Sequence, residues 1–266
     1  MTTNPLFYLQ LLLFLINLRP SSSSPESFVY VGCSQLKYSS GSPYESNLNS
    51  ILASFVNSAS IAAFNSFKIS SPGSTAAVYG LYQCRGDLAA ADCHRCVASA
   101  VSRIGAFCAG TSGGALQLDG CFIKYDNESF VGTVDKAVVS EKCGAATAAG
   151  YGGSDDVLTR RDAVLAYLKD GGGQYFRVGG SGKVQGMVQC VQDLSLGECQ
   201  ECLSEAVQRL KSDCAAAPSG DMFLGKCYAR YSDHGYSSEG GGRRRGWPGK
   251  IAVVAGLGWL IWVLRQ

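Results

Sequence analysis

The sequence predicts two tandem, disulfide-crosslinked domains that contain both helices and strands, and the first observation behind this prediction is a duplicated cysteine pattern. Five cysteines between Cys84 and Cys121 are spaced 9, 3, 12 and 13 residues apart, and the stretch from Cys190 to Cys227 repeats this spacing 106 residues later. One further cysteine precedes each stretch. The two sets of six are Cys33, Cys84, Cys93, Cys96, Cys108 and Cys121, and then Cys143, Cys190, Cys199, Cys202, Cys214 and Cys227.

Length and composition are the second observation. A chain of 266 residues accommodates two domains of about 100 residues each. Twelve cysteines in two sets of six indicate an oxidising compartment, where disulfides persist. A net charge of +2 gives no strong electrostatic attraction to nucleic acid, so no nucleic-acid partner is expected.

The N-terminal stretch has the length of a signal-peptide core. Residues Leu6 to Leu18 form an apolar run interrupted only by Gln10 and Asn17, too short for a typical membrane span. We therefore predict a signal peptide over residues 1–24, cleaved near Ser22 to Pro25, and a secreted or cell-surface protein.

The first domain is predicted over residues 25–134. Apolar residues recur at three- and four-residue steps from Leu48 to Ala59, which indicates a helix with one buried face. Short runs rich in aromatic and β-branched residues indicate strands. The predicted strands are Phe28–Val31, Val78–Gln83 and a pair, Leu116–Tyr125 and Phe130–Val134, joined by a turn at Asp126–Glu128; the predicted helices are Tyr44–Phe64 and Ala90–Phe107.

The second domain, residues 137–236, repeats this plan, with a helix over Ser154–Leu168 and a strand over Val184–Gln189. Ser195 and Glu198 have the spacing of a capping box at the start of the next helix. The first domain has Ala89 at the position of Ser195, so its second helix lacks this cap and is expected to fray more easily.

The tail contains a glycine-rich hinge over residues 237–250 and an uncharged apolar run over residues 251–264. As a helix, this run spans about 21 Å, which is short of the roughly 30 Å hydrocarbon core of a bilayer. We predict a short transmembrane segment that leaves the two domains extracellular. A lipid-anchor signal and a truncated end are the alternatives.

The cysteine string Cys84-x8-Cys93-x2-Cys96 resembles the signature of the ginkbilobin-homologous domain, the plant stress-antifungal cysteine-rich module. Two such domains with a signal peptide, a terminal hydrophobic segment and no kinase resemble the plasmodesmata-located proteins, a family of cysteine-rich repeat secretory proteins. The resemblance covers residues 28–236. Further similarities lie at Gly41–Tyr44, Tyr79–Gly80 and Cys121–Tyr125.

The resemblance implies an α+β fold for each domain, with two helices packed on an antiparallel sheet of about five strands. It also implies a disulfide pairing, which the spacing alone leaves open among fifteen connectivities per domain. The implied pairs are Cys33–Cys108, Cys84–Cys93 and Cys96–Cys121, and then Cys143–Cys214, Cys190–Cys199 and Cys202–Cys227.

Few residues suggest chemistry. Cys93-His94-Arg95-Cys96 has the form of a redox or metal motif, but the second domain has Gln200 and Glu201 between its equivalent cysteines, so structural disulfides are expected instead. The Arg85-Gly86-Asp87 adhesion tripeptide is likewise absent from the second domain. We expect no catalysis, no metal and no cofactor, and one glycosylation site at Asn127, on the predicted hairpin tip.

The sugar site of the family's mannose-binding members corresponds to Ser34, Ala115 and Asp126 in the first domain. None of these is the family's Asn, Arg or Glu, and losing the Arg removes the strongest fork donor. Mannose binding through this degenerate site is therefore not expected in either domain. The equivalent residues of the second domain are Gly144, Asp221 and Ser232.

The expected function is that of a non-enzymatic, membrane-anchored recognition protein at plasmodesmata that modulates cell-to-cell trafficking. Its implied partners are a cell-wall glycan or an extracellular protein, with viral movement proteins and receptor-like kinases as candidates, and the resemblance associates it with callose deposition. The alternatives are a soluble lectin-like or antifungal protein secreted to the apoplast and a kinase-less co-receptor ectodomain.

Overall fold

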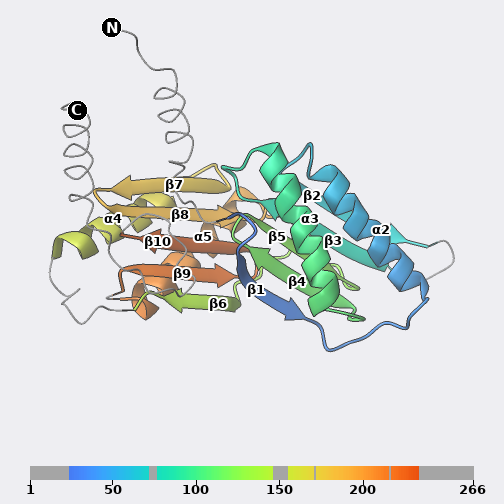
Figure 1. The fold of residues 1–266 in the computed structure, drawn as a ribbon. Helices are drawn as coiled ribbons and strands as arrows, with labels where there is room; N and C mark the ends of the chain where they lie inside the picture. Colours follow the sequence, from blue (N-terminus) through green and yellow to red (C-terminus); the bar gives the residue numbers. More distant parts are fainter. Residues whose placement is uncertain (1–23, 72–76, 146–154, 171, 216, 234–266) are drawn as a thin grey trace, which may run out of the picture.

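Each half of the chain folds into a five-stranded antiparallel sheet with two helices on one face (Figure 1). The computed structural model describes residues 24–71, 77–145, 155–170, 172–215 and 217–233. It confirms the expected fold class, two disulfide-rich α+β domains in tandem. Outside the described residues lie residues 1–23 of the predicted signal peptide, the whole hinge at residues 237–250 and the apolar run at residues 251–264.

The first domain has the strand order β1-β4-β5-β3-β2. All four pairings in its sheet are antiparallel, and β1 and β2 form the two edges. Its elements are β1 (Phe28–Cys33), α2 (Pro43–Ser58), β2 (Phe64–Ser70), β3 (Ala77–Cys84), α3 (Ala90–Phe107), β4 (Gly113–Leu118) and β5 (Cys121–Asp126).

The second domain has the equivalent order, β6-β9-β10-β8-β7, with β6 and β7 at the edges. Its two helices also pack on one face, so each domain has one sheet face that its own helices leave uncovered. Its elements are β6 (Val138–Cys143), α4 (Asp155–Asp170), β7 (Phe176–Ser181), β8 (Val184–Cys190), α5 (Leu196–Asp213), β9 (Ser219–Leu224) and β10 (Cys227–Ser232).

Helix α2 shows why the buried face of the first domain forms. The Ser42 hydroxyl accepts a hydrogen bond from the Glu45 backbone N–H, which caps the helix start. Ile51 and Phe55 are fully buried and lie over Gly80 of β3, where an added Cβ would come within 2.7 Å of both side chains. A glycine at this position therefore lets the helix approach the sheet closely.

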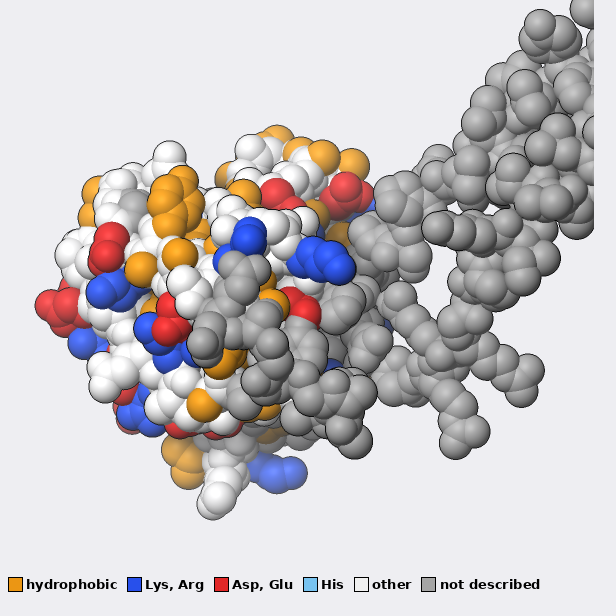
Figure 2. Space-filling view, turned by 90° about the vertical axis from the view of Figure 1, so that its left-hand side faces the viewer, with side chains coloured by type: hydrophobic (Ala, Val, Ile, Leu, Met, Phe, Trp, Pro, Cys, Tyr) orange, Lys and Arg blue, Asp and Glu red, His pale blue; other side chains and the backbone are white. Residues whose placement is uncertain are grey.

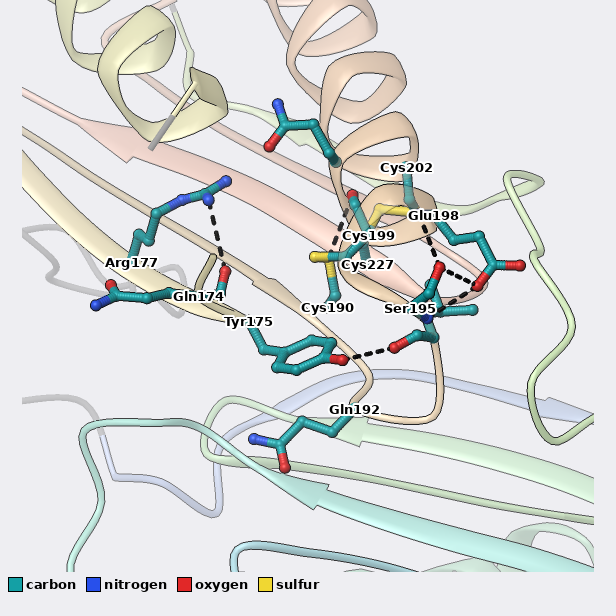
Figure 3. The surroundings of a disulfide bond; sticks show 12 residues. Gln174, Tyr175, Arg177, Cys190, Gln192, Ser195, Glu198, Cys199, Cys202 and Cys227 are labelled. Atoms are coloured by element: carbon teal, nitrogen blue, oxygen red, sulfur yellow. Dashed lines mark hydrogen bonds between the residues drawn. A yellow bond between two sulfur atoms is a disulfide. The ribbon is translucent and has the colours of Figure 1, made fainter. Parts of the chain in front are cut away.

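Helix α5 begins with the predicted capping box. The Ser195 hydroxyl accepts from the Glu198 N–H, and the Ser195 N–H donates to the Glu198 carboxylate at 2.8 Å (Figure 3). The start of α3 has no side-chain cap at Ala89, as the sequence predicts. The two domains thus share a helix but differ in how its first turn is satisfied.

The prediction that the first helix extends to Phe64 is wrong. Helix α2 ends at Ser58, and Phe64 begins the edge strand β2, opposite Gln83 of β3. The Tyr82 hydroxyl of β3 holds the connection, because it donates to the backbone oxygen of Ala62 at 2.9 Å. This long-range pairing prevails over the helical spacing, and it supplies a strand that the sequence analysis missed.

The predicted strand pair at the end of the first domain is also wrong. Residues Leu116–Tyr125 belong to two strands, β4 and β5, joined by a turn at Asp119–Gly120. Residues Phe130–Val134 form no strand and connect the domains. The turn is held from outside the sheet, because the Gly120 N–H donates to the Pro25 carbonyl at 2.7 Å.

Six disulfides crosslink the two domains internally, and they pair all twelve cysteines. In each domain, one bond links a central strand to a helix, one links that helix to the next strand, and one links the edge strand to the end of the helix. The pairs are Cys33–Cys108, Cys84–Cys93, Cys96–Cys121, Cys143–Cys214, Cys190–Cys199 and Cys202–Cys227, the same ones that the family resemblance implies.

Candidate functional site

The two sequence motifs that suggested chemistry have structural roles. Cys93 is bonded to Cys84 and Cys96 to Cys121, so the C-x-x-C pair holds two different strands and carries no free thiol. Arg85 of the adhesion tripeptide is turned inward toward Asp119. An added Cβ at Gly86 would lie 2.6 Å from the Phe176 side chain of the second domain, so the tripeptide is part of the junction between the domains.

The degenerate sugar-site positions of the first domain come together on the sheet face that the helices leave uncovered. Ser34 and Asp126 approach from either side of Gly113, where an added Cβ would lie 3.2 Å and 3.0 Å from their side-chain atoms. Ala115 is partly buried and packs against a cluster of buried residues, Leu81, Phe122 and Val191, to which both domains contribute. The position where the family's Arg would stand therefore belongs to the packing between the domains.

In the second domain, the equivalent acid has a different partner. Asp221 of β9 lies opposite Arg230 of β10 and accepts hydrogen bonds from it at 2.7 Å and 3.3 Å. Gly144 lies against Ser219, whose hydroxyl oxygen would be 2.5 Å from an added Cβ. Ser232 pairs with Ser219 across the two strands. These residues form part of a packed surface.

A chain of alternating charges crosses the domain junction. Arg85 bridges Asp87 at 2.7 Å and Asp119 at 2.6 Å, and Arg230 bridges Asp119 at 2.6 Å and Asp221 at 2.7 Å. The Asp119 side chain, which the two arginines share, is 5 % exposed and that of Arg230 is 8 % exposed. Burial opposes the charged form of Arg230, but Asp221 and Asp119 raise its pKa above the ordinary value.

Two equivalent glutamines add polar contacts between the domains. Gln83 accepts a hydrogen bond from the backbone N–H of Gln192 at 3.1 Å, and Gln189 donates to the Cys84 carbonyl at 2.9 Å. Gln83 and Gln189 stand 106 residues apart, at matching positions of β3 and β8. Each domain therefore uses the same side chain to satisfy the backbone of the other.

The connection between the domains is fastened by a buried lysine. Lys226 is 1 % exposed, donates to the Phe130 carbonyl at 3.0 Å and forms an ion pair with Asp193. Lys226 and Lys124, one from each domain, also lie 5.2 Å and 4.6 Å from the centre of the Phe130 ring. Burial lowers the pKa of Lys226, and Asp193 offsets only part of this effect.

The space left at the junction is small. A cavity of about 30 Å³ lies between the domains, lined by Tyr30, Gln83, Gln117, Gln189 and Tyr228 among others. Such a cavity has room for a water molecule and none for a sugar ring. Burial raises the pKa of the Tyr30 and Tyr228 hydroxyls, so both stay protonated. The junction thus serves domain assembly.

Asn127 lies in the exposed turn that follows β5, although this turn is not the hairpin tip that the sequence predicted. Asn127, Glu128 and Ser129 are all exposed, so the acceptor and its hydroxyl residue are accessible to solvent. Glycosylation there remains a prediction.

The end of the molecule formed by the second domain carries interspersed acidic and basic side chains and scattered apolar ones (Figure 2). None of the described helices has the length and apolar character that crossing a membrane requires.

The sequence analysis missed the residues that join the domains, above all Asp119, Lys226 and Arg230. One signal was available: Lys226 and Arg230 are cations beside and within a short run of otherwise apolar and aromatic residues, which is typical of a buried strand. Their partners could not be inferred, because Asp119 and Arg230 are 111 residues apart.

The family model described as "Salt stress response/antifungal" matches residues 32–128 and 142–234. Plasmodesmata-located protein 7 of Arabidopsis thaliana is 52% identical over 250 residues, which cover 91% of this chain and 80% of that protein. Plasmodesmata-located protein 6 of the same plant is 54% identical over 225 residues, or 84% and 77% of the two chains.

Among solved structures, the tandem DUF26 ectodomain of the Arabidopsis thaliana cysteine-rich receptor-like protein PDLP5 aligns with a TM-score of 0.72 at 46% identity. The alignment covers 77% of this chain and 98% of that one. The corresponding ectodomain of PDLP8 gives the same TM-score at 41% identity and covers 78% and 98%.

The fold and the junction define a tandem disulfide-rich module of a class that is generally non-catalytic. Its two domains meet through a buried charge chain, and the cavity described between them has a volume of only about 30 Å³. With both domains matched and two relatives above 50% identity, the chain belongs to the plasmodesmata-located protein family, whose members carry tandem stress-antifungal (DUF26) domains.

Proposed function

We propose that this chain is a non-enzymatic, membrane-anchored extracellular recognition protein that acts at plasmodesmata and modulates cell-to-cell trafficking. The observation that carries the proposal is the 52% identity to plasmodesmata-located protein 7 across 91% of the chain, which includes both domains. Callose deposition and the capture of viral movement proteins are the processes through which it acts. The apolar run at residues 251–264 supplies the membrane attachment.

Recognition takes place on the outer surfaces of the paired domains. Support comes from the junction, where Ala115 is covered and Asp221 is held by Arg230, so the family's sugar-site positions are used for packing. The partner is a cell-wall glycan or an extracellular protein such as a receptor-like kinase, bound outside these positions. The disulfides make the module durable in the wall space.

Localisation of the tagged full chain tests this proposal. The fluorescent protein is placed inside the chain, between the signal peptide and residue 25, and is compared with the same chain lacking residues 243–266. We expect punctate signal at the cell wall for the full chain and loss of that pattern for the shortened one. An even distribution of the full chain over the plasma membrane contradicts the proposal.

A trafficking assay separates location from action. Movement of a fluorescent tracer between epidermal cells and aniline-blue staining of callose are measured while the chain is expressed at rising levels. We expect both to change with expression of the full chain and not of the chain lacking residues 243–266. Punctate localisation without a change in either measurement limits the protein to a binding role.

A kinase-less co-receptor is the second candidate. One observation favours it: the chain is 34% identical over 176 residues to cysteine-rich receptor-like protein kinase 42 of Arabidopsis thaliana, which covers 25% of that longer protein. Crosslinking on intact tissue followed by purification of the full chain distinguishes the two. A receptor kinase recovered in proportion to the chain supports this candidate. If no receptor kinase is recovered, the co-receptor candidate is rejected and the plasmodesmal role stands.

A further inference from the structure

Two of the six disulfides differ from the others in their exposure. Cys33 of β1 and Cys143 of β6 are exposed, whereas the other ten half-cystines are at most 4 % exposed. Each exposed cysteine is bonded to a buried one, Cys108 or Cys214, at the end of the long helix of its domain. An external thiol can therefore reach one sulfur atom in each domain without unfolding the core.

These two bonds hold the edge strands that lie nearest the domain junction. β1 and β6 are the outer strands of their sheets, and each pairs with only one other strand. Tyr30 of β1 also makes a ring contact with Phe223 of the second domain at 5.9 Å. Opening the Cys33–Cys108 bond thus removes the crosslink between β1 and the end of α3. β1 is a strand that contributes to the contact between the domains.

The surroundings of the two bonds differ in charge. A carboxylate oxygen of Glu141 lies 3.8 Å from the Cys143 sulfur, and the Glu141 oxygen and the sulfurs of Cys143 and Cys214 all lie within 4.8 Å of one another. The residue two positions before Cys33 is Val31, which packs against the core. A carboxylate repels an incoming thiolate and disfavours a departing one, so Glu141 protects the second bond from exchange.

We propose that Cys33–Cys108 is a thiol-exchange site for small extracellular thiols of the glutathione class, and that Glu141 protects the equivalent bond of the second domain. The thiolate attacks the exposed Cys33 sulfur and forms a mixed disulfide, while Cys108 leaves as a thiolate and takes a proton from solvent. A second thiol molecule attacks the mixed disulfide, forms its own oxidised dimer and releases Cys33 as a thiol. The net result is one protein disulfide reduced and two thiols oxidised.

Timed alkylation measures the order of opening. The full chain is purified under non-reducing conditions, exposed to reduced glutathione, quenched at intervals with N-ethylmaleimide and mapped by mass spectrometry. We expect Cys33 and Cys108 to be modified first, and glutathione to be found on Cys33. Two unit charges 4 Å apart in water interact by about 1 kcal/mol, so the rate for Cys143 and Cys214 should be about five-fold lower.

The variant Glu141→Gln removes the protecting charge, and Glu128→Gln makes the same charge change at an exposed residue of the first domain. We expect Glu141→Gln to raise the exchange rate of Cys143–Cys214 about five-fold and Glu128→Gln to leave it unchanged. Simultaneous opening of all six bonds, or earlier opening of Cys143–Cys214, overturns the proposed site. Equal rates for both variants overturn the protecting role of Glu141.

Discussion

Arg230 shows how one residue can determine the use of a surface. It stands on a sheet face that the helices leave uncovered, yet it bridges Asp221 of its own sheet and Asp119 of the other domain. Asp221 accepts two hydrogen bonds from Arg230, and Asp119 is shared between Arg230 and Arg85, since buried carboxylates without a partner are costly. The residue that pairs with the acid at the family's sugar-site position thus also bridges the two domains.

Replacing Arg230 by Met tests this dependence. The change removes the hydrogen-bonded cation of Asp221 and one of the two cations of Asp119, which keeps Arg85, so we expect the free energy of unfolding to fall by about 1.5–3 kcal/mol in denaturant titration of the full chain. Arg209→Met is the matched control, since Arg209 pairs with Glu205 on an exposed helix surface and should cost at most about 0.5 kcal/mol. Equal losses in both variants would contradict the proposed role of Arg230.

A second test at the residue scale concerns the buried lysine. Lys226→Met leaves Asp193 buried beside an apolar side chain and removes the donor to the Phe130 carbonyl, so we expect a loss of about 3 kcal/mol. Lys124→Met removes a contact with the same Phe130 ring but no buried ion pair, and it should cost at most about 1 kcal/mol. Thermal unfolding of both variants decides this, and a milder effect at Lys226 would count against the fastening role.

The structural role of a residue could be predicted where it depends on neighbouring residues of the chain. The Ser195–Glu198 cap and the bare start at Ala89 follow from spacing alone, and the structure confirms both. The pairing of Asp119 with Arg230 could not be predicted, because nothing local indicates which strand faces which across the junction. The sequence analysis located the degenerate sugar-site positions. It could not predict their contacts, because these depend on how the two domains pack against each other.

At the scale of elements, the start of α5 has a defined pH response. The hydrogen bond from the Ser195 hydroxyl, and then that from its backbone N–H, hold the pKa of Glu198 below its ordinary value of 4.5. A lowered pKa in the folded state stabilises the fold above the unfolded pKa, and this stabilisation is lost as the pH falls through the folded pKa. The first turn of α5 should therefore loosen in acid.

The variant Ser195→Ala tests the cap. We expect a loss of about 1 kcal/mol of stability at neutral pH and a rise of the Glu198 pKa toward its ordinary value, followed by NMR of the side-chain carboxyl. Ala89→Ser, the reciprocal change in α3, should slow amide exchange in the first turn of that helix. An unchanged Glu198 titration in Ser195→Ala would show that the cap does not set the pKa.

The boundaries of an element could be predicted where the element is a long amphipathic helix, as in Ala90–Phe107, which the structure confirms. They failed where a partner strand overrides local spacing, as at Phe64, and where a two-residue turn divides an apolar run, as at Asp119–Gly120. Edge strand β2 has one neighbour and an irregular pattern, so its own sequence carries little signal.

At the scale of the whole molecule, the connection between the domains fixes their relative placement. Lys124 and Lys226, one from each domain, lie 4.6 Å and 5.2 Å from the centre of the Phe130 ring, and the Gly132 N–H donates to Asp193 at 2.9 Å. Together with the charge chain, these contacts make the tandem unit a single body. The segment that links the two domains along the chain therefore also helps to hold them in a fixed relative position.

Phe130→Ala tests this at the same scale. The variant keeps the backbone carbonyl that Lys226 uses and removes only the ring that both lysines contact. We therefore expect small-angle scattering of the full chain in detergent to show a broader distribution of interdomain distances. Phe107→Ala is the control, since Phe107 is 54 % exposed and its ring partner is Phe28 of its own domain. An unchanged distribution for Phe130→Ala would assign the placement to the charge chain alone.

The repeat offset has a consequence for how this architecture can vary. Asp119 and Gly120 correspond to Gly225 and Lys226, so the same turn offers an acid to the partner in one domain and a cation to the connection in the other. The halves of the duplicated gene are therefore no longer interchangeable. A chimera carrying the first half twice would place the equivalent of Lys124 opposite Asp119 in place of Arg230, and the equivalent of Gly120 in place of Lys226, so the connection between the domains would lose its buried cation.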